Sequence, residues 1–261
     1  MLPLYDAHAH LADSRLQDSL PEILQDCRAH GVKGILANAA HLSEWTTIVK
    51  LGEKPDIHPA IGLHPFFIDE WTDDCPARLE QALLDTPAAS VGEIGLDAWS
   101  SRDALPKQKE ILASQLLVAQ KHHRFVSLHN RRTWSDFFEV LKELGITELH
   151  GVCHHFTGSP EIARKLLDLS LYLSFCGPVT YPDARRIHAA AIFAPLDRIL
   201  SETDCPDLPP LPCKGQLSRP WHVQYVVETL AELRHTTVPL MAELIERNWH
   251  SLFPTSRNLE V

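Results

Sequence analysis

Two histidines near the start of the chain, His8 and His10, are the first residues whose type and spacing suggest chemistry. They stand two positions apart in an apolar segment that we expect to be a β-strand, where such side chains leave the same face. Two imidazoles on one face can hold a single metal ion. Because such a pair is more often incidental, it becomes informative only together with other ligands.

Four further residues with metal-binding side chains each stand at the end of an apolar run: Glu93, His129, His154 and Asp204. In a barrel of parallel strands the carboxyl ends of all strands meet at one rim, so these side chains would converge with the histidine pair. Imidazole and carboxylate ligands without a thiolate suit a divalent ion such as zinc, manganese or magnesium. The pattern therefore predicts a hydrolytic metal centre.

The elements that would position these residues alternate along the whole chain. Eight β-type runs are separated by segments with helical periodicity, which is typical of βαβ units and of a (β/α)8 TIM barrel. A chain of 261 residues is within the range of one such barrel, so we expect a single domain over 1–261. The expected strands are 4–11, 32–39, 57–65, 88–97, 125–130, 148–157, 171–177 and 198–206.

Three helices are predicted from their periodicity, at 107–123, 221–234 and 240–252. In the first of them, Leu112, Leu116 and Ala119 recur on one face. We expect that face to pack inward, and the lysines and glutamines of the same helix to lie on the other face.

The composition places the chain among globular proteins. Hydrophobic residues make up 44% and charged residues 22%, with no apolar run long enough to span a bilayer. The first residues lack the pattern of a signal peptide, so we expect a cytoplasmic protein, a monomer, with its six scattered cysteines reduced. A net charge of -10 argues against a general basic surface for long nucleic acids, but it leaves room for a local phosphate-binding cleft.

Six ordered motifs, spread over almost the whole chain, resemble the TatD-like deoxyribonucleases of the amidohydrolase superfamily. Gln108, Gln115 and Asn248 also match positions of that family. The six motifs are Asp-Ala-His-Ala-His-Leu (6–11), Gly-Leu-His-Pro (62–65), Gly-Glu-Ile-Gly-Leu-Asp (92–97), Leu-His-Asn-Arg (128–131), His-His-Phe-Thr-Gly (154–158) and Glu-Thr-Asp-Cys-Pro (202–206).

The resemblance implies a metal-dependent hydrolase with two divalent ions. His8, His10 and Asp204 would hold one ion, His129 and His154 the other, and Glu93 would bridge them. Two ions about 4 Å apart can activate water and stabilise the leaving oxygen of a phosphodiester. The implied substrate is DNA, at ends or in single strands, cleaved in the manner of a 3′–5′ exonuclease.

Asp204 is the candidate general base that takes the proton of the attacking water, and Glu202 could orient it or a substrate group. Arg131 matches a family position and could form a bidentate contact with a phosphate, while the role of Arg132 stays open. His64 could donate to a phosphate oxygen or to the leaving group.

Departures from the family pattern fall near the expected substrate. His155 replaces a small residue or cysteine, Ser201 replaces an apolar residue, and Arg219 in the segment 216–220 adds a positive charge close to the cleft. Aromatic residues in the rim loops could stack on bases or could simply anchor the loops. They are Phe66, Phe67, Trp99 and Tyr181. The histidines outside the six motifs have no ligand spacing, and we expect them to be surface or packing residues.

Two other functions are compatible with these residues. The same metal centre could hydrolyse an ester, amide or lactone of a small molecule, and the negative net charge favours this alternative. The second alternative is a barrel that keeps its metals but serves only as a binding module. The complete set of ligands argues against it.

Overall fold

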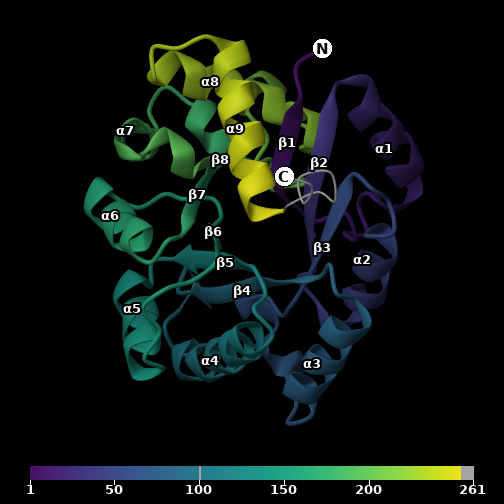
Figure 1. Cartoon of the computed structure of the whole chain (residues 1–261), viewed down its shortest axis with the longest axis vertical. Helices are drawn as coiled ribbons and strands as arrows, with labels where there is room; N and C mark the ends of the chain where they lie inside the picture. Colours follow the sequence, from purple (N-terminus) through teal and green to yellow (C-terminus); the bar gives the residue numbers. More distant parts are fainter. Residues whose placement is uncertain (100, 254–261) are drawn as a thin grey trace, which may run out of the picture.

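The computed structural model describes residues 1–99 and 101–253 and contains eight parallel strands that neighbour one another in chain order. The first and last strands approach at their carboxyl ends, where Ala9 pairs with Cys205, so the sheet curls into a nearly closed barrel (Figure 1). The predicted (β/α)8 fold is thereby confirmed. The strands are β1 (Leu4–Ala9), β2 (Val32–Asn38), β3 (Ile57–Ile61), β4 (Ser90–Asp97), β5 (Val126–Arg131), β6 (Gly151–Cys153), β7 (Tyr172–Phe175) and β8 (Ile199–Ser201).

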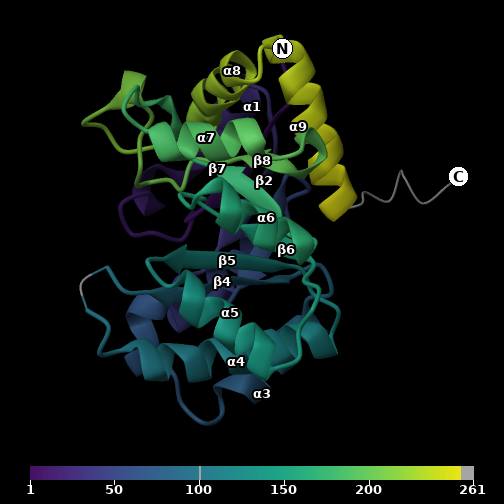
Figure 2. The same ribbon diagram turned by 90° about the vertical axis from the view of Figure 1, so that its left-hand side faces the viewer.

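Helices surround the strands, and Figure 2 shows α3, α4 and α5 on one side of the barrel and α7, α8 and α9 on the other. All eight residues of β4 are buried, as expected for a strand covered on both faces. None of the helices in the described residues is long and apolar enough to cross a membrane. The helices are α1 (Leu20–Ala29), α2 (Trp45–Leu51), α3 (Cys75–Asp85), α4 (Leu105–Lys121), α5 (Trp134–Glu143), α6 (Pro160–Asp168), α7 (Arg185–Phe193), α8 (Val223–Leu233) and α9 (Val238–Leu252).

Two strands are much shorter than the runs predicted for them. β6 ends at Cys153 and β8 at Ser201, whereas the predicted runs continue to 157 and 206. Beyond these ends the backbone turns, with φ of 41° at His155 and 54° at Asp204. Positive φ is uncommon for residues other than glycine and occurs often at functional sites. The last candidate ligands therefore lie on turns that follow the strands.

Helix α4 holds two neighbouring strand ends in place through two buried glutamines, for which the prediction of an outward position was wrong, whereas Gln120 is exposed as predicted. Gln108 accepts from the Asp97 N–H at 2.9 Å and donates to the Asp97 carbonyl at 3.0 Å. Gln115 accepts from the Leu63 N–H at 2.8 Å and donates to the carbonyl of Leu63 at 3.3 Å. Both glutamine side chains lie on the same buried face of the helix as Leu112. There they satisfy the backbone groups at the two strand ends, which would otherwise be buried without hydrogen-bond partners.

Helix α9 positions the start of β8 in a similar way. It begins two residues earlier than predicted, with the Thr237 hydroxyl accepting from the N–H of Leu240 at 3.3 Å as a cap. The Asn248 amide, further along the helix, donates to the carbonyls of Leu196 and Ile199 at 2.8 Å each. The segment that leads to Asp204 is therefore anchored from outside the barrel.

Candidate metal centre

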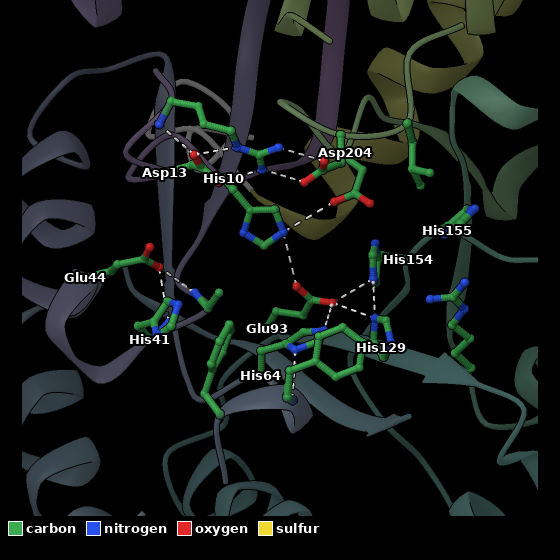
Figure 3. A pocket seen from close by; sticks show the side chains of 17 residues that line it. His10, Asp13, His41, Glu44, His64, Glu93, His129, His154, His155 and Asp204 are labelled. Atoms are coloured by element: carbon green, nitrogen blue, oxygen red, sulfur yellow. Dashed lines mark hydrogen bonds and ion pairs between the residues drawn. The ribbon is translucent and has the colours of Figure 1, made fainter. Parts of the chain in front are cut away.

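The carboxylate of Glu93, on β4, lies at the centre of a cluster of histidines (Figure 3). Its Oε1 is 2.8 Å from both Nδ1 of His129 and Nε2 of His154. Its Oε2 is 3.3 Å from both Nε2 of His8 and Nε2 of His10. Each oxygen of Glu93 therefore faces a different pair of histidines.

Asp204 joins the pair formed by His8 and His10. Its Oδ1 lies 3.3 Å from Nε2 of His10 and 3.8 Å from Nε2 of His8. The backbone fixes this arrangement, because the Asp204 N–H donates to the carbonyl of His8 at 2.9 Å and the His10 N–H donates to that of Cys205 at 2.8 Å. The structure thus brings all six predicted ligands together where β1 meets the segment after β8.

The carboxylates beside two of the rings show that the cluster fits a divalent cation. Nε2 of His129 lies 2.8 Å from the Asp97 carboxylate, and Nδ1 of His154 lies 3.4 Å from that of Glu202. A carboxylate only accepts, so it favours a proton on these nitrogens and leaves lone pairs on the opposite ones. Those opposite nitrogens are 3.1 Å apart and face Oε1 of Glu93. The other oxygen, Oε2, is buried with no hydrogen-bond donor among the described residues.

Without a cation, the cluster attracts protons instead. Burial by itself would lower the pKa of His10, but the nearby carboxylates of Asp204 and Glu93 outweigh it and raise that pKa well above its ordinary value. Burial would likewise raise the pKa of Glu93, but the nearby His64, His154 and His8 hold it well below. Protons and metal ions therefore compete for the same nitrogens.

Several residues that support the ligands were not identified from the sequence. Asp97 contacts His129, the Ser127 hydroxyl lies 3.1 Å from Nδ1 of His8, and Asp6 accepts from the Thr203 N–H at 2.8 Å. Strand alternation was an available signal, because Asp97 stands four residues after Glu93 and Asp6 stands two before His8. Ser127 carries no comparable signal, since a serine in a strand is ordinary.

A cavity of about 370 Å³ opens over the cluster, and His64 contributes to its wall. Nδ1 of His64 accepts from the N–H of Phe66 at 3.1 Å, so the ring proton is on Nε2, which lies 3.5 Å from Glu93 Oε1. Burial lowers the pKa of His64 to about 3, so the ring is neutral. His64 can therefore donate a hydrogen bond near the cluster without carrying a charge.

Of the three other predicted substrate contacts, Arg131 lines the cavity, whereas Glu202 and Arg219 do not. Arg131 stands at the end of β5. Glu202 has no exposed surface and accepts from the N–H of His155 at 2.6 Å, so it lies behind His154 rather than in the cavity. Arg219 is outside the cavity lining and donates to the carbonyl of Ser218 at 3.2 Å. Ser201 donates to the carbonyl of Tyr5 at 3.0 Å, which links β8 to β1.

The rim aromatic residues also differ in position. Phe66 and Phe67 line the cavity, whereas Trp99 lines an adjoining one. Tyr181 donates to the carbonyl of Pro209 at 3.3 Å and so joins two loops. His41, which had no ligand spacing in the sequence, also lines the cavity, and its Nδ1 lies 2.6 Å from the carboxylate of Glu70.

Comparison with known proteins identifies the family of the chain. A family model described as "TatD related DNase" matches residues 5–254. An uncharacterized metal-dependent hydrolase of Bacillus subtilis, YabD, is 34% identical over 96% of this chain and 98% of its own. A second one, YcfH of Escherichia coli, is 32% identical over 96% of this chain and 95% of its own.

The solved structures include a close fold match. The crystal structure of YjjV, a TatD homologue from Escherichia coli, superposes with a TM-score of 0.90 at 30% identity, covering 97% of this chain and 98% of that one. The family match, the two relatives and this structure all span nearly the whole barrel and its six-residue cluster. The chain therefore belongs to the TatD family of metal-dependent hydrolases.

Proposed function

We propose that the protein is a phosphodiesterase that cleaves DNA at ends or in single strands and uses two divalent ions. The observation that carries this proposal is the position of Glu93, whose two oxygens face two separate groups of ligands. A carboxylate that offers one oxygen to each group can hold two ions at the short separation of a two-metal hydrolytic centre. The description of the family model as a DNase supports the choice of substrate.

Each ion would have its own ligands. His8, His10 and Asp204 would hold one, His129 and His154 would hold the other, and Glu93 would contact both. The donor set of imidazoles and carboxylates suits zinc, manganese or magnesium. When bound, such ions lower the pKa of water and stabilise charge on the phosphoryl and leaving oxygens.

Asp204 is the residue best placed to take the proton from the attacking water. Its side chain is 13% exposed, whereas that of Glu93 is 2% exposed, so water reaches Asp204 more easily. Burial would raise the pKa of Asp204, but the hydrogen bond from His10 and the nearby His154 and His8 lower it, which keeps the carboxylate ionised. An ionised carboxylate beside an acidified water can act as the general base.

Two other residues would hold the phosphate. Nε2 of His64 would donate to a phosphoryl oxygen, because its other ring nitrogen is already occupied by the Phe66 N–H. Arg131 would supply a guanidinium, whose planar array of donors matches two oxygens of one phosphate. Both residues line the same cavity as the candidate ligands.

A small-molecule ester, amide or lactone is the second candidate substrate. It is favoured by the modest volume of the cavity, about 370 Å³, and by the acidic side chains of Asp13, Glu44 and Asp207 on its wall. Arg15, which pairs with Asp13 and Asp207 on the same wall, offsets only one of these three charges, so this side of the cavity would repel a phosphate chain.

Hydrolysis of 3′-labelled single-stranded DNA, compared with a panel of small esters, amides and lactones, separates the two candidates. The enzyme would be stripped by a chelator and then supplied with zinc, manganese or magnesium in turn. We expect release of the labelled 3′-terminal nucleotide only after a metal is restored, and none with a Glu93→Gln variant. DNA that survives while a small ester or amide is hydrolysed would establish the second candidate instead.

A further inference from the structure

A second cavity of about 370 Å³ adjoins the one over the metal centre, and we call it the side cavity. The two cavities share His129, Arg131, His154 and His155 in their walls, so a bound molecule could extend from one into the other. This feature is not used by the function proposed above.

The side cavity is basic. Arg131, Arg132 and Arg186 line it, and in residues 1–99 and 101–253 no carboxylate oxygen lies within 4.0 Å of their guanidinium nitrogens. A single exposed arginine without an acidic partner is ordinary. Here three arginines line one cavity beside the metal centre, although the chain has a net charge of -10. Together they form a local site for an anion.

The backbone at Arg132 creates this concentration of charge. Consecutive side chains of an extended strand point to opposite sides, so Arg131 and Arg132 would ordinarily diverge after β5. Arg132 instead adopts a positive φ of 64°. As a result both guanidinium carbons approach the Trp99 ring, at 3.7 Å and 4.0 Å from its centroid.

Stacking on Trp99 prepares the two arginines to bind phosphate. A guanidinium that rests on an aromatic face keeps its N–H edges free for hydrogen bonds. The stack also restricts long side chains before the ligand arrives, which lowers the entropy lost on binding. Trp99 is therefore a positioning residue in this arrangement, and Arg186 at the start of α7 completes the lining.

We propose that the side cavity binds the phosphodiester next to the one that is cleaved. The inference rests on the proposed phosphodiesterase function and specifies its substrate as a nucleic acid strand, in contrast to an ester with one phosphate. Arg131 lies at the junction of the cavities, while Arg132 and Arg186 contact only the neighbouring phosphate. The strand therefore leaves the metal centre past His155 and the arginines, away from the wall of Asp13, Glu44 and Asp207, whose negative charge Arg15 offsets only in part.

The test compares two substrates of the metal-loaded enzyme, tetrathymidylate and the p-nitrophenyl ester of thymidine 5′-phosphate, which has one phosphate. The variant is the double substitution Arg132→Gln and Arg186→Gln. The matched control is Arg185→Gln with Arg247→Gln, which removes the same charge from exposed positions outside both cavities. The readout is the ratio of kcat/KM for tetrathymidylate to kcat/KM for the ester.

We expect this ratio to fall about 10- to 100-fold in the variant, chiefly through KM, because charge-assisted hydrogen bonds to one phosphate are lost. The slope of log kcat/KM against log salt for tetrathymidylate should become shallower by roughly 0.7 for one phosphate contact. The control should keep the wild-type ratio. Trp99→Leu should raise the tetrathymidylate KM in the same direction, and Trp99→Phe should restore part of it.

Two results would overturn the inference while leaving the proposed function intact: a wild-type ratio in the variant, or equal losses in variant and control. Failure of the wild-type enzyme to hydrolyse either substrate with any of the metals would refute the proposed function itself, and the inference with it.

Discussion

The carboxylate of Asp97 lies 2.8 Å from Nε2 of His129, on the side of the ring opposite to Glu93. This contact fixes which nitrogen of His129 faces the metal centre. Asp97 is itself held by α4, since Gln108 bonds both its backbone groups. The ligand, its carboxylate partner and the supporting helix thus form a continuous chain of contacts.

Asp97→Asn should weaken metal binding about 10- to 100-fold, which is the usual effect of losing such a partner of a ligating histidine. The amide can present its N–H₂ group to Nε2 and so favour the wrong ring tautomer. Titration of the stripped protein with zinc, followed by calorimetry, measures the affinity. Asp197→Asn, at an exposed site with only a distant arginine, serves as the control. Equal affinities in both variants would show that Asp97 does not support the ligand.

Asp204→Asn should lower turnover by at least about 10²-fold, the usual range for a general base, because the amide accepts protons poorly. Thermal stability should change little, since the substitution keeps the shape and lies at the rim rather than in the packed core. Kinetics must be accompanied by elemental analysis of bound metal.

Glu93→Gln provides the contrast. It removes the carboxylate between both groups of histidines, so bound metal as well as turnover should fall. If Asp204→Asn keeps near-normal turnover at full metal occupancy, another group takes the proton.

Gln115→Leu should lower the free energy of unfolding by about 1–3 kcal/mol, because it leaves the buried N–H and carbonyl of Leu63 without partners. Urea unfolding of the metal-free protein measures this, so that differences in metal binding do not contribute. Gln120→Leu, at an exposed position of the same helix, should change stability much less. Similar values for the two variants would contradict the role given to Gln115.

Metal affinity should rise as pH rises through the neutral range. In the metal-free protein the pKa of His10 and the pKa of His154 are raised, because their carboxylate contacts outweigh burial, so both rings carry protons that metal must displace. Each proton released makes log K increase with pH with a positive slope. Calorimetry in two buffers of different ionisation enthalpy counts these protons. A count of zero near neutral pH would show that the rings are already deprotonated.

The sequence predicts the barrel well, because the alternation of apolar runs and amphipathic helices repeats eight times. It also predicts that His8, His10, Glu93, His129, His154 and Asp204 meet, because strand order alone brings the strand ends to one rim. Other features depend on contacts that have no local signature. Gln108 and Gln115 look like polar surface residues until the strand-end backbone they satisfy is known.

The side cavity illustrates the same limit. Nothing in the pair Arg131 and Arg132 indicates that both side chains will reach one ring, because that depends on the positive φ at Arg132. His41 reaches the metal-centre cavity through the loop after β2, where its spacing from other ligands carries no information. Sequence periodicity cannot predict side-chain positions that depend on turns and loops.

The most direct test of the two-metal centre is anomalous diffraction from crystals of the manganese-loaded protein, recorded on both sides of the manganese absorption edge. We predict two anomalous peaks about 3.5–4 Å apart. One should lie among His8, His10 and Asp204, the other beside His129 and His154, with one oxygen of Glu93 bound to each. A single peak at full manganese occupancy, or two peaks that Glu93 does not bridge, would contradict the account.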